Sequence, residues 1–471
     1  MARLAWFSPV PPVATGVATC SADLISQLGS QLGSQLGSQL GSPLGSQLGR
    51  AHEIDVFVDE PVVRVATGVK SAHDFVWRHR QRPYDLTVFQ VGNSSHHDYL
   101  WPYLFRYPGL TVLHDAHLHH ARAAALLRND RADDYRREFA ANHPDTTPDL
   151  AELAIAGFDS RLYYDWPMTR LIAERSRLVA VHSAPLAEEL ASDFPGARVR
   201  AVRLGHGTRL SNEETGVASN RARTRYQIKN DAIVYGCYGG LSPDKRLPQV
   251  LAALAATRLY IPAAHLLLAG DIDRLGLNGA VTVTGYLPTD EEFTDCIAAC
   301  DIALNLRWPS AREISGPWLR CLAAGKPTVI VDLAHMSDVP TLDPRTWQPN
   351  LRTGAGRPGT GISSAPCAVA IDILDEDHSL RLAMRRLGSD ALLRSALGRA
   401  AQEYWQGAHS LEIMVRDYEE LIRDAMQQPI PDIPLPAHLI DNAEATLVSV
   451  LGNVGVAVPV DTQTTDPMIP Q

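Results

Sequence analysis

The sequence predicts an α/β protein with two doubly wound domains. Short apolar segments typical of buried strands alternate with helical segments, which indicates parallel sheets. The alternation runs through two series, separated by the polar stretch 211–222. A chain of 471 residues, 45% of them hydrophobic and 20% charged, is also too long for one ordinary core. We therefore expect a first domain over residues 1–205 and a second over residues 206–400.

The first series opens with a strand, a loop and a helix. The apolar run 3–8 predicts a buried strand, the Pro- and Gly-rich segment 9–16 a loop, and a helix is expected from about Val17. Residues 27–49 repeat Gln-Leu-Gly-Ser, and each glycine costs a helix roughly 1 kcal/mol against alanine. We interpret this repeat as a flexible or poorly helical insertion. Further strands of the first series are expected at 52–58, 85–90, 111–114, 177–182 and 199–204.

The second series starts beyond the polar stretch. Its strands are expected at 232–238, 264–269, 281–284, 302–306 and 327–331. The charged interval 128–149 in the first domain predicts a helical insertion or a mobile loop. Residues 379–427 have a helical pattern, and the helix over 401–428 is expected to pack back toward the first domain. The Pro-rich residues 429–471 predict a tail that wraps around the protein or is disordered.

Charge and cysteine content exclude several classes of function. The formal net charge of −10 argues against a protein that binds nucleic acid through a basic face. Six cysteines without CxxC spacing predict reduced thiols in a cytoplasmic protein rather than a disulfide framework. No apolar run approaches 18 residues, so we expect no membrane span, although a peripheral membrane contact is compatible with the sequence.

Three loops stand where parallel sheets bind ligands, after a strand and before a helix. The first ends at Gly16, where glycine lets the backbone approach a ligand closely, although a simple tight turn explains it equally well. The second is Tyr238-Gly-Gly-Leu-Ser-Pro-Asp-Lys-Arg246, in which Gly240 precedes the adjacent cations Lys245 and Arg246. Paired cations beside a glycine turn suit a pyrophosphate and supply charge that a metal would otherwise provide. The alternative for this segment is a solvated helix end.

The third loop follows the strand expected at 302–306. Glu313 precedes the turn Ser315-Gly316, and Pro317 stands in the first turn of the following helix. Backbone amides at Ser315 and Gly316 are expected to face the cleft, and the nearby Glu313 carboxylate to accept hydroxyl hydrogens of a ribose or a sugar.

Taken in order, these segments resemble glycosyltransferase family 4. The resemblance rests on Phe7-Ser-Pro-Val-Pro-Pro-Val-Ala-Thr-Gly16, Gly-Gly-Leu-Ser-Pro-Asp-Lys-Arg246, Thr284-Gly-Tyr-Leu-Pro288 and the run from Arg312 to Pro327. It covers about residues 3–425 in collinear order. It implies the GT-B fold, in which two Rossmann-like domains face a cleft. It also implies that the second domain binds the nucleotide, the first binds most of the acceptor, and the sugar is transferred with retention.

The resemblance also implies roles for single residues. Lys245 matches a phosphate-binding lysine, and Gly16 the loop at the donor phosphates. His114 matches a histidine that contacts the transferring sugar. Gly285, Tyr286 and Leu287 match the loop beside the base.

The chain departs from the family pattern at several positions. Gly240 stands where an arginine is usual, and Arg312 and Arg320 stand where two glutamates eight residues apart are usual. Glu313 lies one place later than the first of these, as in a subgroup with Gly-Glu-Thr-Ser-Gly in this loop. These departures leave open which group holds the ribose.

Two other clusters carry weaker signals. His114-Asp-Ala-His-Leu-His-His120 resembles a metal cluster but lacks the cysteine or carboxylate pattern of such sites, so we expect no metal. Asp271-Ile-Asp273 has metal-diphosphate spacing, but loop capping is the favoured interpretation.

The sequence therefore predicts a glycosyltransferase that uses a nucleotide-diphosphate sugar as co-substrate and needs no other cofactor. The expected acceptor is a carbohydrate or a lipid-linked molecule, and no nucleic acid partner is expected. Two alternatives stay open: a catalytically silent subunit that binds a nucleotide sugar, and a nucleotide-sugar epimerase on the same fold.

Overall fold

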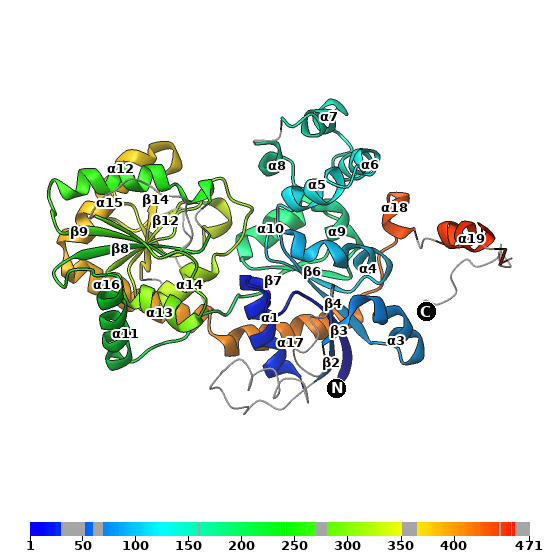
Figure 1. Cartoon of the computed structure of the whole chain (residues 1–471), viewed down its shortest axis with the longest axis horizontal. Helices are drawn as coiled ribbons and strands as arrows, with labels where there is room; N and C mark the ends of the chain where they lie inside the picture. Colours follow the sequence, from blue (N-terminus) through cyan, green and yellow to red (C-terminus); the bar gives the residue numbers. More distant parts are fainter. Residues whose placement is uncertain are drawn as a thin grey trace.

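The computed structural model describes residues 1–29, 52–59, 69–158, 161–240, 242–269, 280–350, 365–441, 444–453 and 455–456. Within these residues the chain forms two sheets of seven strands, and every pair of neighbouring strands is parallel. Figure 1 shows the two sheets in separate lobes. The repeat expected at 27–49 lies outside the described residues from position 30 on, as do Asp271 and Asp273.

The first sheet contains the strands of the first predicted series. Its order from one edge to the other is β3 (Val69–Ser71), β2 (His52–Val58), β1 (Ala2–Phe7), β4 (Leu86–Val91), β5 (Leu110–Leu113), β6 (Leu178–Val181) and β7 (Val199–Ala201). The chain runs outward from β1 in one direction and from β4 in the other, so the strand order reverses between them. Such a reversal opens a crevice at the carboxyl ends of the two strands.

The second sheet repeats this arrangement. Its order is β10 (Val281–Val283), β9 (Ala264–Ala269), β8 (Ile233–Tyr238), β11 (Ile302–Leu304), β12 (Thr328–Val331), β14 (Ala368–Ile371) and β13 (Thr341–Leu342). Here the order reverses between β8 and β11. The strands β3, β13 and β14, which the sequence did not predict, are only two to four residues long. Such short segments have too few residues for their pattern to be distinctive.

Helices cover both faces of each sheet (Figure 1). Those of the first domain are α1 (Gly16–Leu28), α3 (Phe75–Gln81), α4 (Trp101–Arg106), α5 (His119–Leu127), α6 (Ala132–Asn142), α7 (Asp149–Ile155), α8 (Leu162–Asp165), α9 (Arg170–Arg175) and α10 (Ala184–Asp193). The second domain contains α11 (Asn212–Arg225), α12 (Leu247–Arg258), α13 (Asp290–Ala299), α14 (Gly316–Ala323), α15 (Glu376–Ser389) and α16 (Ala391–Ala408). The interval 128–149 is largely helical, because it contains α6.

The helix α17 (Leu411–Gln427) returns to the first domain and lies beneath its sheet in Figure 1. Its Tyr418 ring stacks on Trp6 of β1 at 6.0 Å between centroids, and Asp417 pairs with Arg203 at 2.5 Å. Because buried aromatic pairs contribute about 0.5–1.5 kcal/mol beyond their buried area, this helix ties the end of the chain to its first strand.

The chain beyond α17 lies along the first domain before α18 (Ala437–Ile440) and α19 (Glu444–Asn453). Leu439 is buried in the core of that domain, and Arg175 donates to the carbonyl of Pro431. His438 contacts Glu138 at 2.6 Å, and Glu138 also forms a buried ion pair with Arg122. Residues 429–441 are therefore an ordered strap on the first domain.

Two further findings concern the helices and the cysteines. None of the helices in the described part of the chain combines the length and apolar character that a bilayer crossing needs. All six cysteines are buried and carry free thiols.

Candidate functional site

Two loops meet at the point where strand order reverses in the second sheet. One follows β8 and contains Lys245, and the other follows β11 and contains Arg307. The backbone N–H of Trp308 donates to the carbonyl of Asp244 at 2.8 Å, which fixes the two loops to each other. Because neighbouring parallel strands end at the same edge, side chains that the sequence separates by 62 positions share one site here.

Lys245 is the central cation of this site. Only 8% of the residue is exposed, and no carboxylate in the described part of the chain lies within ion-pair distance of its ammonium. Burial and, to a smaller extent, the nearby Arg307 lower the pKa of Lys245 to about 8, whereas Asp244 and Glu313 oppose the shift. A bound anion would relieve this penalty, because it would favour the charged form of the ammonium.

Glu313 holds Arg307 in place. Its Oε1 lies 2.6 Å from Nε of Arg307, and its Oε2 accepts a hydrogen bond of 3.0 Å from the Ser310 hydroxyl. A second ion pair joins Arg307 to Asp244 at 3.6 Å. The structure thus brings Lys245 and Glu313 together, as the sequence predicts, and adds Arg307 beside them.

Arg246, the second cation of the predicted pair, is bound to a carboxylate. Its guanidinium forms two bonds of 2.8 and 2.5 Å to the carboxylate of Glu376 in α15. The backbone of Arg246 is left-handed, with φ 57°, at the junction of the short helix Pro243–Lys245 and α12. The Arg246 charge is therefore compensated, whereas that of Lys245 is not paired with any carboxylate of the described residues.

Ser315 and Gly316 lie at the start of α14. Ser315 is the N-cap, since its hydroxyl accepts a bond of 3.4 Å from the N–H of Trp318. A Cβ added to Gly316 would lie 3.2 Å from the ring of His206, so a side chain there would crowd the linker between the domains. The first amides of α14 remain a source of partial positive charge near Glu313.

The other predicted glycines lie in open surroundings. Among the described residues, none lies within 4 Å of a Cβ added to Gly16, Gly240 or Gly285, and Gly285 has φ 74°, which favours glycine. Gly16 starts α1 in the first domain, whereas Gly285 follows β10 at one edge of the second sheet. Beside it, Tyr286 is 66% exposed and Leu287 packs against the core.

His114, which the resemblance links to the transferring sugar, forms hydrogen bonds inside the first domain. Its Nε2 donates to the side-chain oxygen of Gln90 at 2.8 Å, and its Nδ1 lies 3.1 Å from Nε2 of His182. Burial and the nearby His182 hold the pKa of His114 well below its usual value, so the ring is neutral. With both ring nitrogens used, the imidazole has no free atom for a sugar hydroxyl.

The next residue, Asp115, reaches the site instead. Its Oδ2 accepts a bond of 2.7 Å from the N–H of Asn93, at the carboxyl end of β4. Burial and, to a smaller extent, the Glu313 carboxylate raise the pKa of Asp115 to about 7, although the Asn93 bond and Arg307 oppose the shift. A carboxyl group with this pKa is suited to proton exchange near neutral pH. Sequence reasoning missed it, although a carboxylate directly after a strand in the His-rich segment was a usable signal.

Backbone bonds join the two domains next to Asp115. The N–H groups of Ala116 and His117 both donate to the carbonyl of Ala311, at 2.9 and 3.0 Å. Arg312 and Arg320 each form an ion pair with a carboxylate of another helix. Arg312 pairs with Glu189 of α10 at 2.7 Å, and Arg320 pairs with Asp290 of α13 at 2.5 Å.

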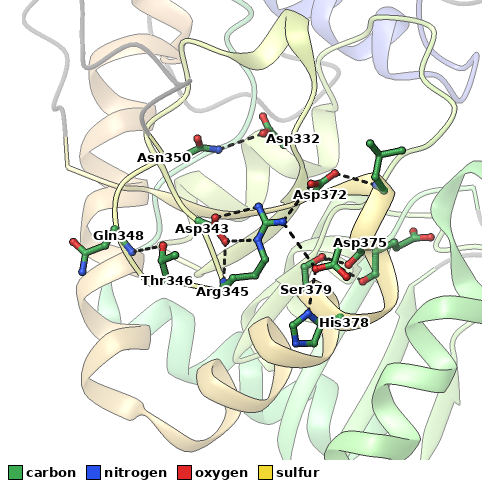
Figure 2. A network of polar contacts seen from close by, with 12 residues as sticks. Asp332, Asp343, Arg345, Thr346, Gln348, Asn350, Asp372, Asp375, His378 and Ser379 are labelled. Atoms are coloured by element: carbon green, nitrogen blue, oxygen red, sulfur yellow. Dashed lines mark hydrogen bonds and ion pairs between the residues drawn. The ribbon is translucent and has the colours of Figure 1, made fainter.

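A second charged cluster lies at the same edge of the second sheet, but it is internally neutralised. Figure 2 shows Asp343 and Asp372, which follow β13 and β14, around the guanidinium of Arg345. Arg345 contacts Asp343 at 3.1 Å and Asp372 at 3.4 Å. The arginine is balanced by carboxylates, so this cluster offers no uncompensated positive charge to an anion.

No set of three or more His, Cys, Asp or Glu side chains in the described ranges has a metal-binding arrangement.

Comparison with solved structures shows the fold. A glycosyltransferase from Rickettsia africae ESF-5 has a TM-score of 0.54 at 12% identity, over 91% of this chain and 99% of that one. The catalytic domain of starch synthase IV from Arabidopsis thaliana, bound to ADP and acarbose, has a TM-score of 0.53 at 11% identity, over 91% and 100%. Sucrose-phosphate synthase from Thermosynechococcus elongatus has a TM-score of 0.51 at 15% identity, over 90% and 98%.

The sequence itself matches no family model and no curated protein. The likeness to solved structures, together with the two parallel sheets and their reversal points, shows that the chain has the GT-B fold with two Rossmann-like domains. This confirms the fold class predicted from the sequence.

Proposed function

We propose that this protein is a glycosyltransferase that moves a sugar from a nucleotide-diphosphate donor to an acceptor hydroxyl, and that it belongs to glycosyltransferase family 4. The observation that carries the proposal is Lys245, a buried ammonium without an ion pair among the described residues, at the reversal point of the second sheet. The fold is one on which this reaction occurs, since the similar structures named above are described as glycosyltransferases and synthases.

In this proposal the donor diphosphate lies against Lys245 and Arg307. Arg307 is held by Glu313 and Asp244, so it is preorganised, while Lys245 supplies the uncompensated charge. The amides at Ser315 and Gly316 add partial positive charge at the start of α14. The loop of Gly285, Tyr286 and Leu287 lies beside the base. One similar structure carries ADP, which is a ligand of this kind.

The chemical step follows from this placement. The bond between the anomeric carbon and the diphosphate oxygen breaks, and the acceptor oxygen bonds to that carbon. Lys245 and Arg307 stabilise the charge that develops on the leaving diphosphate, in a buried site where such stabilisation is strongest. We propose transfer with retention, attack and departure being on one face, and without a metal, because the two cations provide the charge.

The acceptor's proton needs a destination, and we propose that Asp115 assists in taking it. The carboxyl lies at the carboxyl edge of the first sheet, facing Glu313, and its raised pKa suits proton exchange near pH 7. The departing diphosphate is the other acceptor for this proton. His114 then has a supporting role, since it fixes the segment before Asp115 through Gln90 and His182.

The remaining parts of the proposal concern acceptor and location. We propose a carbohydrate or lipid-linked acceptor bound mostly by the first domain, and a cytoplasmic protein with at most a peripheral membrane contact. No nucleic acid is expected, given the net charge of −10.

The test is release of nucleoside diphosphate from a panel of nucleotide sugars, with and without a mixture of carbohydrate acceptors. We expect one donor to release its diphosphate slowly alone and faster with acceptor, in the presence of a metal chelator. Binding without any release would identify the silent subunit, and sugar conversion without net release would identify the epimerase.

A further inference from the structure

A cavity of about 340 Å³ lies beside the candidate site, between the two domains. Its walls come from α8, α10 and the segment after β5 in the first domain, and from Arg312 in the second. Ligand pockets commonly have volumes of roughly 300–1,000 Å³, so this cavity suits a small ligand. The site described above does not use it.

The cavity adjoins the proposed transfer centre. Tyr164 lines it, and burial followed by the charges of Asp244 and Glu313 raises the pKa of that phenol, so the Tyr164 side chain lies close to both carboxylates. His117 lines it from the other side, two positions after Asp115, and its N–H donates to Ala311 in the second domain at 3.0 Å. A ligand in this cavity would therefore stand next to Asp115 and Glu313.

The charges on the walls favour a cation over an anion. Three carboxylates, on Asp165, Glu189 and Asp193, face one guanidinium, on Arg312. Arg312 is paired with Glu189 at 2.7 Å and Arg161 lies 3.9 Å from Asp165, so Asp193 is the lining carboxylate that has no ion pair among the described residues. The pKa of His117 is lowered to about 4 by burial, with a smaller effect from Arg312, and the ring adds no positive charge at neutral pH. A phosphate would be repelled here.

Apolar side chains also line the cavity. Leu186, Leu190 and Phe194 line it, and Tyr164 adds a second aromatic ring. Aromatic faces suit the C–H face of a sugar ring and attract a nearby ammonium through their quadrupole. The cavity thus combines an apolar surface with a carboxylate edge.

We propose that this cavity is the acceptor subsite and takes a small hydroxylated molecule with an amino group, an amino sugar or a similar amine, and rejects phosphorylated acceptors. Its place in the reaction rests on the proposed glycosyltransferase function, whereas the binding of such a ligand does not. Asp165 and Asp193 would bind the ammonium, and the aromatic wall would hold the ring.

The experiment measures binding of glucosamine, glucose and glucose 6-phosphate to the full chain without nucleotide, by ligand-observed NMR titration. We expect glucosamine to bind about tenfold more tightly than glucose, because its ammonium adds one charge-assisted contact at a partly exposed carboxylate, and glucose 6-phosphate to bind weakest. The D165N/D193N variant should lose the preference for glucosamine. Glu188→Gln, which removes a carboxylate from the same helix outside the cavity, should keep it.

Glucosamine binding no tighter than glucose, tightest binding of glucose 6-phosphate, or an unchanged preference in D165N/D193N would each overturn the proposal. The Phe194→Ala variant gives a second check, because it should weaken all three sugars together. Binding of UDP, ADP and GDP is measured in parallel. Glucosamine binding with no nucleotide binding would refute the proposed function and leave the cavity assignment standing, and the reverse result would do the opposite.

Discussion

At the carboxyl edge of the first sheet buried polar side chains form hydrogen bonds with one another, whereas the same edge of the second sheet holds a buried cation, Lys245. His114 and His182 pair with each other, and Gln90 completes the chain of bonds. Lys245 has no ion pair within the part of the chain that the structure describes. The two edges are equivalent in topology, so it is the buried charge without an ion pair, rather than the place in the fold, that distinguishes the second edge from the first.

Replacement of Lys245 is expected to have the largest effect of the substitutions considered. Replacing Lys245 with Ala should reduce nucleoside diphosphate release about 10²–10³-fold, as removal of a charge-stabilising donor does in other enzymes, while the thermal midpoint stays similar or rises. Steady-state release from the best donor measures this. Lys229→Ala, an exposed lysine in the same domain, is the control and should be unaffected. Equal rates for the two variants would refute the assignment of Lys245.

At the edge of the first sheet Asp115 is a carboxyl group with a strongly raised pKa. The pH dependence of the unfolding free energy tests this shift. Because its pKa is raised from 3.8 to about 7 in the folded protein, its contribution to stability is present at low pH and is lost as pH rises toward 7. Asp115→Asn cannot ionise, so it should not lose stability as pH rises. It should therefore be more stable than the wild type at pH 8 by on the order of a few kcal/mol. Urea unfolding of both proteins at pH 5 and pH 8 measures the difference. An equal gain at the two pH values would contradict the account.

The same variant sharpens the catalytic role of Asp115. If the carboxylate takes the acceptor's proton, the rise of wild-type turnover with pH near 7 should disappear in Asp115→Asn, with donor affinity kept. A variant with the wild-type pH profile would limit Asp115 to a structural role.

His114 should behave as a structural residue. Replacing it with Asn leaves Gln90 and His182 without their partner, which should cost about 1–3 kcal/mol of unfolding free energy. The KM for the donor should not change, because both ring nitrogens face inward. Thermal unfolding and donor titration measure the two effects. A raised KM with unchanged stability would restore the sugar-contacting role that the sequence suggested.

Arg246 should have the smallest effect on binding. Arg246→Ala removes the pair with Glu376 and should cost about 1 kcal/mol of stability, since the pair is only partly buried. Nucleotide affinity, measured by titration calorimetry, should stay within twofold of wild type. Loss of affinity comparable with that of Lys245→Ala would show that both adjacent cations bind phosphate after all.

The sequence allowed prediction of the features that depend on long apolar runs and chain order. β1, β8 and β9 are such runs, and the placement of Lys245 after β8 follows from strand and loop order. The inward-facing His114 and the diverted Arg246 were not predictable in this way. One depends on a partner 68 positions away, and the other on a left-handed backbone at one residue. The residue Arg307 can be read from the sequence, but its position beside Lys245 depends on the pairing of β8 with β11, which the sequence does not show.

The central claim is that the Lys245 ammonium, which has no ion pair among the described residues, binds the donor diphosphate. The pH dependence of nucleoside diphosphate binding tests this claim most directly. With UDP, ADP, GDP and CDP as probes, we expect the affinity of the best one to fall between pH 7 and pH 9.5, because the pKa of Lys245 is lowered to about 8 in the free protein. Lys245→Arg, whose charge persists to high pH, should bind with a flatter profile. Wild-type affinity that stays constant over this range, or that survives in Lys245→Ala, would contradict the account.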